Sequence, residues 1–499
     1  MNYTSTRNNT LCVTSAEAIT KGISTDGGLF VPTSMPKITP EFIDELTGKS
    51  YIDRARQVLS LFLTDFSKEE IDFCTNGAYS TGFSHEKVAP VVSLTDTASI
   101  LELWHGPTCA FKDMALQLLP YLLTKSVKKT APEQEIVILV ATSGDTGKAA
   151  LEGFKDVDGT RILVFYPNDG VSPMQKLQMT TQEGSNVGVC AIYGNFDDAQ
   201  TGVKKIFTDE QIKAELLKHN LAFSSANSIN WGRLVPQIVY YFSAYADMVA
   251  SGKVRNGEKV NFTVPTGNFG NILAAYYAME MGLPVNRLIC ASNANDVLTE
   301  FLTEGRYNRM RPFHTTVSPS MDILISSNLE RLLFHICGEN SDTVNTLFSS
   351  LSEKGEYTVS EEILTKIKSV FSAGKCDDNK TKETIAKIWK ENNYLCDTHT
   401  AVAVAVYNDY KEQTGDMTPT VIASTANPYK FSQAVLGAVT DGKYSAADEF
   451  SMVDELQQTT AVKAPAQLAE LKGKEPIFKG ICNKEDMTKE VFKLLNINA

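Results

Sequence analysis

Short apolar runs followed by glycine-bearing turns recur through the middle of the chain. EIVILVA ends at residue 141 and leads into TSGDTGKAALEGF, while VNFTVP ends at residue 265 and leads into TGNFGNILAAYYAMEMG. TRILVFYP and VGVCAIYG are two more runs of strand length, each followed by a segment with helical spacing. Apolar strands that alternate with helices are typical of parallel sheets covered on both faces. The pattern therefore predicts an α/β fold from about residue 130 onward.

The beginning of the chain follows a different pattern. PEFIDELTGKSYIDRARQVLSLFL and SKEEIDFCTNGAYS have helical spacing, so residues 1–95 are expected to form a mostly helical N-terminal extension. A chain of 499 residues is too long for one compact core. We therefore expect two open, twisted, mostly parallel α/β lobes after the extension. Residues 130–230 would form the smaller lobe, and residues 96–129 together with 231–499 the larger one.

Composition narrows the possible partners and the compartment. A net charge of −12 argues against binding to nucleic acid or to an anionic membrane surface. The N-terminus lacks the order of a secretory signal, and no apolar run reaches the length of a membrane helix. The nine cysteines are scattered and never spaced as CxxC, which favours reduced thiols over disulfides or a zinc site. We expect a cytoplasmic protein without a bound metal.

The turn TGNFGN has features of an anion site. Helix N-termini present unpaired N–H groups and the positive end of the helix dipole. Gly267 and Gly270 would let the backbone approach an anion closely, and Asn268 and Asn271 could add donors. A plain strand-to-helix turn with an asparagine cap explains the same residues equally well.

The turn ATSGDTGKAAL offers a second such loop. It is not a nucleotide-binding P-loop, because Thr142 and Ala149 stand where that motif needs glycine and a hydroxyl residue. Neither loop has the GxGxxG spacing of dinucleotide sites. Both loops follow strands, and open α/β sheets bind ligands at the carboxyl ends of their strands. Two anion sites near each other would suit a phosphorylated cofactor with an anionic substrate, although the coincidence of two glycine loops could also be chance.

Lys112 is the candidate for covalent chemistry. In LELWHGPTCAFKDMALQLLPYLL it falls in the first turn of a segment with helical spacing, directly after Phe111. A lysine at the edge of an apolar segment can lose its hydration, which lowers the pKa of the ammonium and frees the amine for Schiff-base formation. Taken alone, a surface lysine with a buried stem is the commoner explanation.

Six ordered motifs resemble the threonine synthases, which are fold-type II pyridoxal-phosphate (PLP) enzymes with a fold similar to that of the tryptophan synthase β-subunit. HGPTCAFKDMALQ resembles the family's lysine motif, and GISTDGGLFVP resembles its N-terminal signature. The other four are ATSGDTGKAA, VPTGNFGN, DTHTAVAVAV and ASTANPYKF. Together they span residues 22–431, so the resemblance covers most of the chain.

The resemblance implies roles for the matched residues. Lys112, in the larger lobe, would carry PLP as an internal aldimine, and Thr425 would bond the pyridine nitrogen. The PLP phosphate would be held by Gly267, Asn268, Phe269, Gly270 and Asn271. The substrate's anionic groups and the O3′ side of PLP would face Ser143, Gly144, Asp145, Thr146 and Gly147. Asp145 departs from the asparagine common in the wider group, and an ionised carboxylate there would repel the phenolate.

The implied activity is that of a carbon–oxygen lyase that eliminates phosphate: O-phospho-L-homoserine and water would give L-threonine and phosphate. The leaving dianion needs cations, for which Lys176 and Arg233 are candidates, with Asn227 and Asn230 as possible further contacts. Alternatives are another fold-type II lyase, such as a serine/threonine dehydratase or a related phospholyase, and a non-catalytic phosphate-binding regulator. The chain would act on this small molecule as a monomer or a homodimer.

Overall fold

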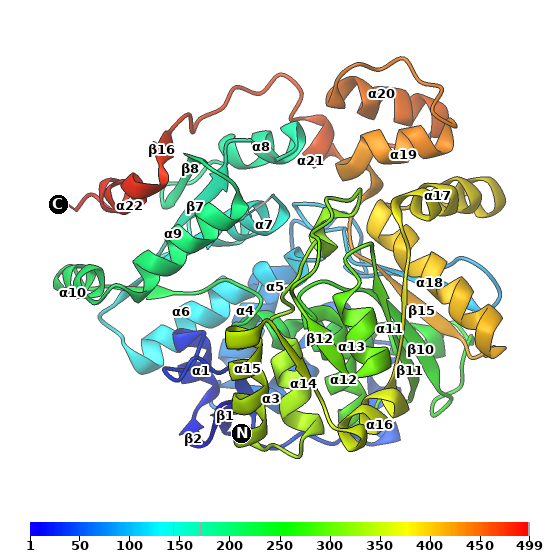
Figure 1. Ribbon diagram of the computed structural model, residues 1–499, viewed down its shortest axis with the longest axis horizontal. Helices are drawn as coiled ribbons and strands as arrows, with labels where there is room; N and C mark the ends of the chain where they lie inside the picture. The colour runs from blue at the N-terminus through cyan, green and yellow to red at the C-terminus, as the bar shows by residue number, and fades with distance from the viewer. Residues whose placement is uncertain (143, 170, 498–499) are drawn as a thin grey trace.

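The computed structural model describes residues 1–142, 144–169 and 171–497. Figure 1 shows two sheet-centred parts, with the N-terminal region packed beneath the larger one. No helix within these ranges is long and apolar enough to cross a membrane.

The larger part is built on a six-stranded sheet. Its strands run in the order β14 (Phe371–Lys375), β11 (Val285–Ser292), β10 (Val260–Pro265), β15 (Thr420–Ser424), β5 (Ala98–Glu102) and β4 (Val91–Ser93). All neighbours are parallel except the edge pair β4 and β5. The central strands β10 and β15 are fully buried, as expected for apolar strands covered on both faces.

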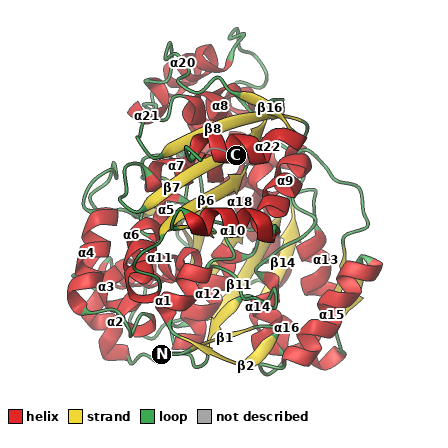
Figure 2. Ribbon diagram, turned by 90° about the vertical axis from the view of Figure 1, so that its left-hand side faces the viewer, coloured by secondary structure: helices red, strands yellow, loops and turns green. Residues whose placement is uncertain are grey.

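Helices lie on both sides of this sheet (Figure 2). They include α11 (Trp231–Ala250), α12 (Gly270–Met281), α13 (Val297–Glu304), α16 (Glu361–Val370), α17 (Asp378–Asn392) and α18 (Thr398–Thr414). The short helix α5 (Asp113–Leu116) and helix α6 (Leu119–Thr130) connect the larger part to the smaller one.

The smaller part has a five-stranded, wholly parallel sheet. Its order is β16 (Ile481–Asn483), β8 (Val187–Tyr193), β7 (Thr160–Pro167), β6 (Glu135–Ala141) and β9 (Leu221–Ser224). Its helices are α7 (Asp145–Phe154), α8 (Pro173–Thr180), α9 (Phe196–Thr208), α10 (Glu210–Lys218) and α22 (Met487–Leu494). The sequence assigned residues 231–499 to the larger lobe, but β16 pairs with β8, so the end of the chain returns to the smaller sheet. A three-residue strand carries too little periodicity to reveal this pairing.

The N-terminal extension contains four helices, as its spacing predicts, and also a small sheet. The helices are α1 (Ser15–Lys21), α2 (Pro40–Leu46), α3 (Tyr51–Phe62) and α4 (Lys68–Tyr79). Thr14 with Glu17, and Ser67 with Glu70, form capping boxes that define where α1 and α4 begin. The antiparallel sheet comprises β1 (Tyr3–Ser5), β2 (Asn8–Val13) and β3 (Phe30–Pro32).

The remaining elements lie around both parts. A two-stranded antiparallel sheet is formed by β12 (Arg306–Asn308) and β13 (Glu356–Thr358), and α14 (Leu329–Ile336) and α15 (Ser341–Lys354) lie between them in the sequence. Near the end of the chain come α19 (Ser432–Val439), α20 (Glu449–Thr460) and α21 (Ala466–Ala469). The 3₁₀ turns of the described residues are η1 (Pro319–Met321), η2 (Pro428–Phe431) and η3 (Lys484–Asp486).

Candidate active site

Lys112 immediately precedes α5, and its amine contacts groups that are distant in sequence. Lys112 Nζ lies 3.3 Å from Ser320 Oγ and 3.8 Å from Asp145 Oδ2, and the side chain is 12% exposed. Burial lowers the pKa of the Lys112 ammonium, and Asp145 partly opposes this shift. The cations of Lys430 and Arg233 lower the same pKa further. The environment therefore favours a neutral amine, the form that reacts with a carbonyl group.

The segment before Lys112 is fixed to the carboxyl end of β15. The amide of Phe111 donates to the Thr425 carbonyl at 2.8 Å, and the amide of Asn427 donates to the Cys109 carbonyl at 3.0 Å. Burial raises the pKa of the Cys109 thiol to about 12, so this thiol stays protonated and is a poor nucleophile. These bonds bring Thr425, the predicted partner of the pyridine nitrogen, next to the lysine segment.

The GPT-x-AFKD sequence makes a tight turn around a buried carboxylate. Asp113 accepts hydrogen bonds from the Thr108 amide at 2.8 Å and from the Thr108 hydroxyl at 2.6 Å. Burial raises the pKa of Asp113 to about 6, although the two bonds from Thr108 lower it. A Cβ at Gly106 would lie 2.5 Å from the Asp113 side chain, so the turn requires glycine there. The turn sets the direction of α5 and hence the position of Lys112.

Asp145 is an ionised carboxylate with its own buried counter-ion. Its Oδ1 lies 2.9 Å from Lys430 Nζ and accepts a hydrogen bond from Gln175 Nε2 at 3.0 Å. Burial tends to raise the pKa of Asp145, but Lys430 and Lys112 outweigh it and hold this pKa below its ordinary value. The Lys430 side chain is fully buried and also donates to the Thr108 carbonyl at 2.8 Å. An ionised Asp145 is thus electrically balanced by the protein itself.

The backbone of the loop around Asp145 is held by Thr142, whose hydroxyl accepts bonds from the amides of Gly144 and Gly147 at 3.0 Å each. Gly144 has a φ of 147° and lies against Gln175, where a Cβ would come within 2.4 Å of the side-chain amide carbon. Thr146 follows in the first turn of α7 and is partly exposed. Ser143, also predicted here, lies outside the described residues.

The second glycine loop joins β10 to α12. Phe269 adopts a left-handed conformation with φ of 63°, and its ring is buried in the core. Gly267 lies so close to the Ser320 carbonyl that a Cβ would come within 2.8 Å of that oxygen. The Asn268 side chain is exposed. The first amides of α12 have no carbonyl four residues earlier within the helix, so they can bind an anion.

Asn271 provides a preset donor beside this loop. Its Oδ1 accepts hydrogen bonds from the hydroxyls of Tyr240 and Tyr241, both at 2.6 Å. Its Nδ2 is buried and has no hydrogen-bond partner among the described residues. Burial raises the pKa of both tyrosines well above the ordinary value, so they remain donors. A phosphate beside Gly270 would satisfy the orphaned Nδ2, so the residues present fit the phosphate of PLP.

Arg233 is a buried cation near the same site. It is 3% exposed, and its guanidinium donates to the Ala226 carbonyl. Among the residues that the structure describes, its Nε has no hydrogen-bond partner and no carboxylate forms an ion pair with it. Burial lowers the pKa of Arg233 to about 10, which still leaves it charged at neutral pH.

One of the predicted substrate contacts is bonded to other parts of the protein. Asn230 is the N-cap of α11: its Oδ1 accepts from the Gly232 amide, and its Nδ2 donates to the carbonyls of Ile19 and Ser225. Its role in the structure is therefore to cap and anchor α11, and the prediction of substrate binding gains no support. Asn227 is exposed.

Lys176 points into a separate hollow on the other side of α8. Its amine donates to Asn168 Oδ1 at 3.2 Å, and the hollow is lined by residues such as Leu177, Phe450 and Phe478. Neighbouring positions of a helix are about 100° apart, so Gln175 can face Asp145 while Lys176 faces away. The prediction that Lys176 contacts the substrate gains no support from this position.

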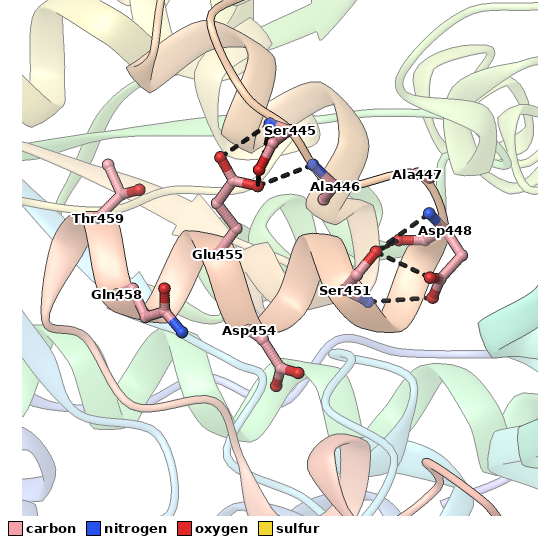
Figure 3. Close-up of a pocket in the computed structure, with 9 residues that line it drawn as sticks. All are labelled: Ser445, Ala446, Ala447, Asp448, Ser451, Asp454, Glu455, Gln458 and Thr459. Atoms are coloured by element: carbon pink, nitrogen blue, oxygen red, sulfur yellow. Dashed lines mark hydrogen bonds between the residues drawn. The ribbon is translucent and has the colours of Figure 1, made fainter.

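Another hollow lies beside α20, and its polar groups satisfy one another. Glu455 accepts hydrogen bonds from the amides of Ser445 and Ala446, and Asp448 caps α20 by accepting from the Ser451 amide (Figure 3). None of the predicted site residues lines this hollow.

Sequence reasoning missed several members of the site. Lys430 stands inside the ASTANPYKF motif but was not assigned a role, although a lysine beside a strand end was a usable signal. Ser320 is 208 residues from Lys112, and no local pattern connects them. Tyr240 and Tyr241 are buried, and their hydroxyls orient Asn271.

Comparisons with known proteins agree with this geometry. The family model "Threonine synthase N terminus" matches residues 2–79, "Pyridoxal-phosphate dependent enzyme" residues 100–425, and "Threonine synthase, C-terminal" residues 400–488. Threonine synthase of Pseudomonas aeruginosa is 40% identical, with coverage of 87% of this chain and 90% of that protein. Human threonine synthase-like 1 is 39% identical over 85% of this chain, which spans 58% of that longer relative.

Solved structures extend the similarity to the whole fold. The PLP-bound threonine synthase of Brucella melitensis superposes with a TM-score of 0.88 at 38% identity and covers 100% of both chains. The predicted fold-type II architecture and the PLP cofactor are therefore confirmed. With matching family models over most of its length and a relative 40% identical across 90% of that relative, the chain belongs to the threonine synthase family of pyridoxal-phosphate-dependent enzymes.

Proposed function

We propose that the chain converts O-phospho-L-homoserine and water into L-threonine and phosphate by γ-elimination followed by β-addition of water. Relatives named threonine synthase support this assignment. The single observation that carries the choice of a phosphorylated substrate is Arg233, a buried guanidinium without a carboxylate partner among the described residues. Buried charges are normally paired, so its counter-ion is expected to arrive with the ligand.

The charges around Lys112 suit an anionic substrate. Lys430 and Arg233 supply two buried cations, Lys112 has an amine with a lowered pKa, and Asp145 supplies one ionised carboxylate held by Lys430. Because Asp145 is already compensated by Lys430, the excess positive charge lies on Arg233. A phosphate dianion leaving from the substrate's Cγ would be stabilised by this excess.

The chain's own residues can carry out the proton transfers. PLP, when bound, supplies the electron sink for carbanions next to the substrate amine. The Lys112 amine, with its lowered pKa, is the proposed base for the α-proton and then for a β-proton. Asn271 Nδ2 and the first amides of α12 would hold the cofactor phosphate, and the Thr425 hydroxyl would face the ring nitrogen. A hydroxyl there donates a hydrogen bond without protonating that nitrogen.

The runner-up is another fold-type II lyase, such as a serine/threonine dehydratase. A dehydratase acts on an uncharged hydroxyl and has no need for an unpaired buried guanidinium at the leaving group. The match of both threonine synthase terminal models favours the first assignment.

The test is a visible absorption spectrum of the purified protein supplied with PLP, recorded before and after O-phospho-L-homoserine is added. Phosphate and threonine are measured in parallel. Spectral change with equal amounts of phosphate and threonine is expected, and Arg233→Met should lose turnover of the phosphorylated substrate. Release of 2-oxobutyrate from threonine or pyruvate from serine, without threonine formation, would support the dehydratase instead.

A reducing, cytoplasmic setting and a monomeric or homodimeric state also belong to this proposal. All nine cysteines are free, and seven of them are buried. Native mass spectrometry of the holoenzyme under reducing conditions tests the assembly: a larger assembly than a dimer would contradict it.

A further inference from the structure

Ser320 lies where it can control the direction of the Lys112 amine. It is the middle residue of the turn η1, and its side chain is exposed to solvent. Its hydroxyl accepts a hydrogen bond from Lys112 Nζ at 3.3 Å and donates to Asp145 Oδ2 at 3.5 Å. The hydroxyl therefore bridges the reacting amine and the ionised carboxylate.

A buried histidine holds the backbone of this serine. The Ser320 amide donates to His399 Nε2 at 3.1 Å, and His399 Nδ1 lies 2.7 Å from Asp397 Oδ2. A ring nitrogen that accepts from an amide carries no proton, so the proton belongs on Nδ1, facing the carboxylate. His399 and Asp397 are both buried at the N-terminus of α18. The order Asp397, His399, Ser320, Lys112 thus links α18 to the reacting amine.

The two ends of the turn are anchored independently of His399. The Asn293 side chain donates to Ser318 Oγ at 3.1 Å and to Asp322 Oδ1 at 2.7 Å. Ser318 is buried, and its hydroxyl makes no contact with Lys112. The chain thus contains two serines in one turn, of which one is structural and the other faces the site.

We propose that Ser320 is a further catalytic residue that orients the Lys112 amine, and that His399 is the positioning residue that holds Ser320 in place. A neutral amine has one lone pair. When Ser320 accepts a hydrogen bond from one N–H group of the Lys112 amine, the amine rotates less freely. Its lone pair can then be directed toward the substrate carbon that loses a proton. Because Ser320 also donates to Asp145, its oxygen is kept as an acceptor for Lys112. This role rests on the proposed function of Lys112 as the base.

The first test compares Ser320→Ala with the matched control Ser318→Ala. We expect Ser320→Ala to lower kcat by about ten- to a hundredfold with KM within about twofold, the loss given by one oriented hydrogen bond in the transition state. Ser318→Ala should lower thermal stability more than Ser320→Ala while changing kcat by less than about threefold. Equal losses of kcat in the two variants would show that the turn matters only structurally and would overturn the proposal.

The second test places His399→Gln in the natural chain and in the Ser320→Ala variant. If His399 acts through Ser320, His399→Gln should lower kcat about tenfold alone and less than about twofold when the hydroxyl is already missing. Additive effects would contradict a positioning role. Should His399→Gln fail to fold, the pair of serine variants still decides the role of Ser320.

A measurement without substrate tests the role of Ser320 independently of the proposed overall reaction. In the holoenzyme, the pH at which the cofactor's visible band changes should shift in Ser320→Ala and in His399→Gln, and stay within error in Ser318→Ala. An unshifted midpoint in Ser320→Ala would refute the contact with Lys112. A protein that makes no threonine but shows these shifts would refute the proposed substrate and leave the role of Ser320 standing.

Discussion

The two glycine loops have the same order of strand, turn and helix but opposite electrostatic states. The loop before α12 has no charged side chain, and its Asn271 has an orphaned buried donor. The loop at the start of α7 contains Asp145, an ionised carboxylate already compensated by Lys430 and Gln175. The first can therefore bind an external anion, whereas the second contains a carboxylate of its own.

This difference shows that a helix N-terminus alone does not determine what binds there. The backbone offers amides and a positive dipole end in both loops. Side chains from other elements determine which group each loop can bind. Tyr240 and Tyr241 donate to Asn271 Oδ1 and so leave its Nδ2 as the free donor, whereas Lys430 pairs with Asp145 and keeps it ionised.

The largest effect is expected from Lys430→Met, because it leaves the buried Asp145 carboxylate without its main partner. Removal of one member of a buried ion pair typically costs about 3–5 kcal/mol. Urea unfolding of the holoenzyme should show a loss of this size. The double variant Lys430→Met with Asp145→Asn should recover part of the lost free energy of unfolding. If the double variant instead loses as much as the two single variants together, the pairing of Lys430 with Asp145 is contradicted.

In the other loop, Asn271→Asp should weaken cofactor binding. The new carboxylate would replace the free Nδ2 donor and repel a phosphate, and loss of a hydrogen bond to a charged group amounts to roughly ten- to a hundredfold in affinity. Equilibrium titration with PLP, followed by absorbance, measures the change.

Tyr240→Phe is the matched control for this effect. Tyr241 still donates to Asn271 Oδ1 in that variant, so the affinity should fall by less than about fivefold. An affinity unchanged in Asn271→Asp would mean that the phosphate lies elsewhere.

The free energy of unfolding should depend on acid pH through the loop that contains Asp145. The pKa of Asp145 is lowered in the folded state, so the folded chain binds fewer protons than the unfolded chain near the ordinary aspartate pKa of about 4. Its stabilising contribution is complete above that pH and is lost as the pH falls through the lower, folded-state pKa. Asp145→Asn should therefore flatten the fall in unfolding free energy below about pH 4. An unchanged slope between pH 3 and 5, measured by urea unfolding, would contradict an ionised Asp145.

The smallest effect is expected at Lys176, which belongs to the same helix as Gln175 but faces the other hollow. Lys176→Ala should change kcat and KM by less than about twofold, because its amine bonds only to Asn168 among the described residues. A large rise in KM for the phosphorylated substrate would bring Lys176 back as a substrate contact.

The sequence predicted what depends on neighbouring residues. Buried strands such as β10, the turn of the second glycine loop and the lysine of the HGPT segment all follow from local pattern or from resemblance. The sequence could not predict contacts between distant segments. Ser320 contacts Lys112, which is 208 residues away in the sequence, and β16 near the end of the chain pairs with β8. The direction of the Lys176 side chain could not be predicted for a similar reason, since helical spacing gives the relative directions of side chains but not which neighbouring element lies on each side.

The central claim is that Lys112 carries the cofactor, and Lys430 is the lysine that could replace it, because both amines lie beside Asp145. Borohydride reduction of the holoenzyme converts an imine between lysine and PLP into a stable amine, and peptide mass spectrometry then locates the added mass. The expected result is one reduced cofactor on the peptide that contains Lys112. Label on Lys430, or on no lysine at all, would contradict the assignment.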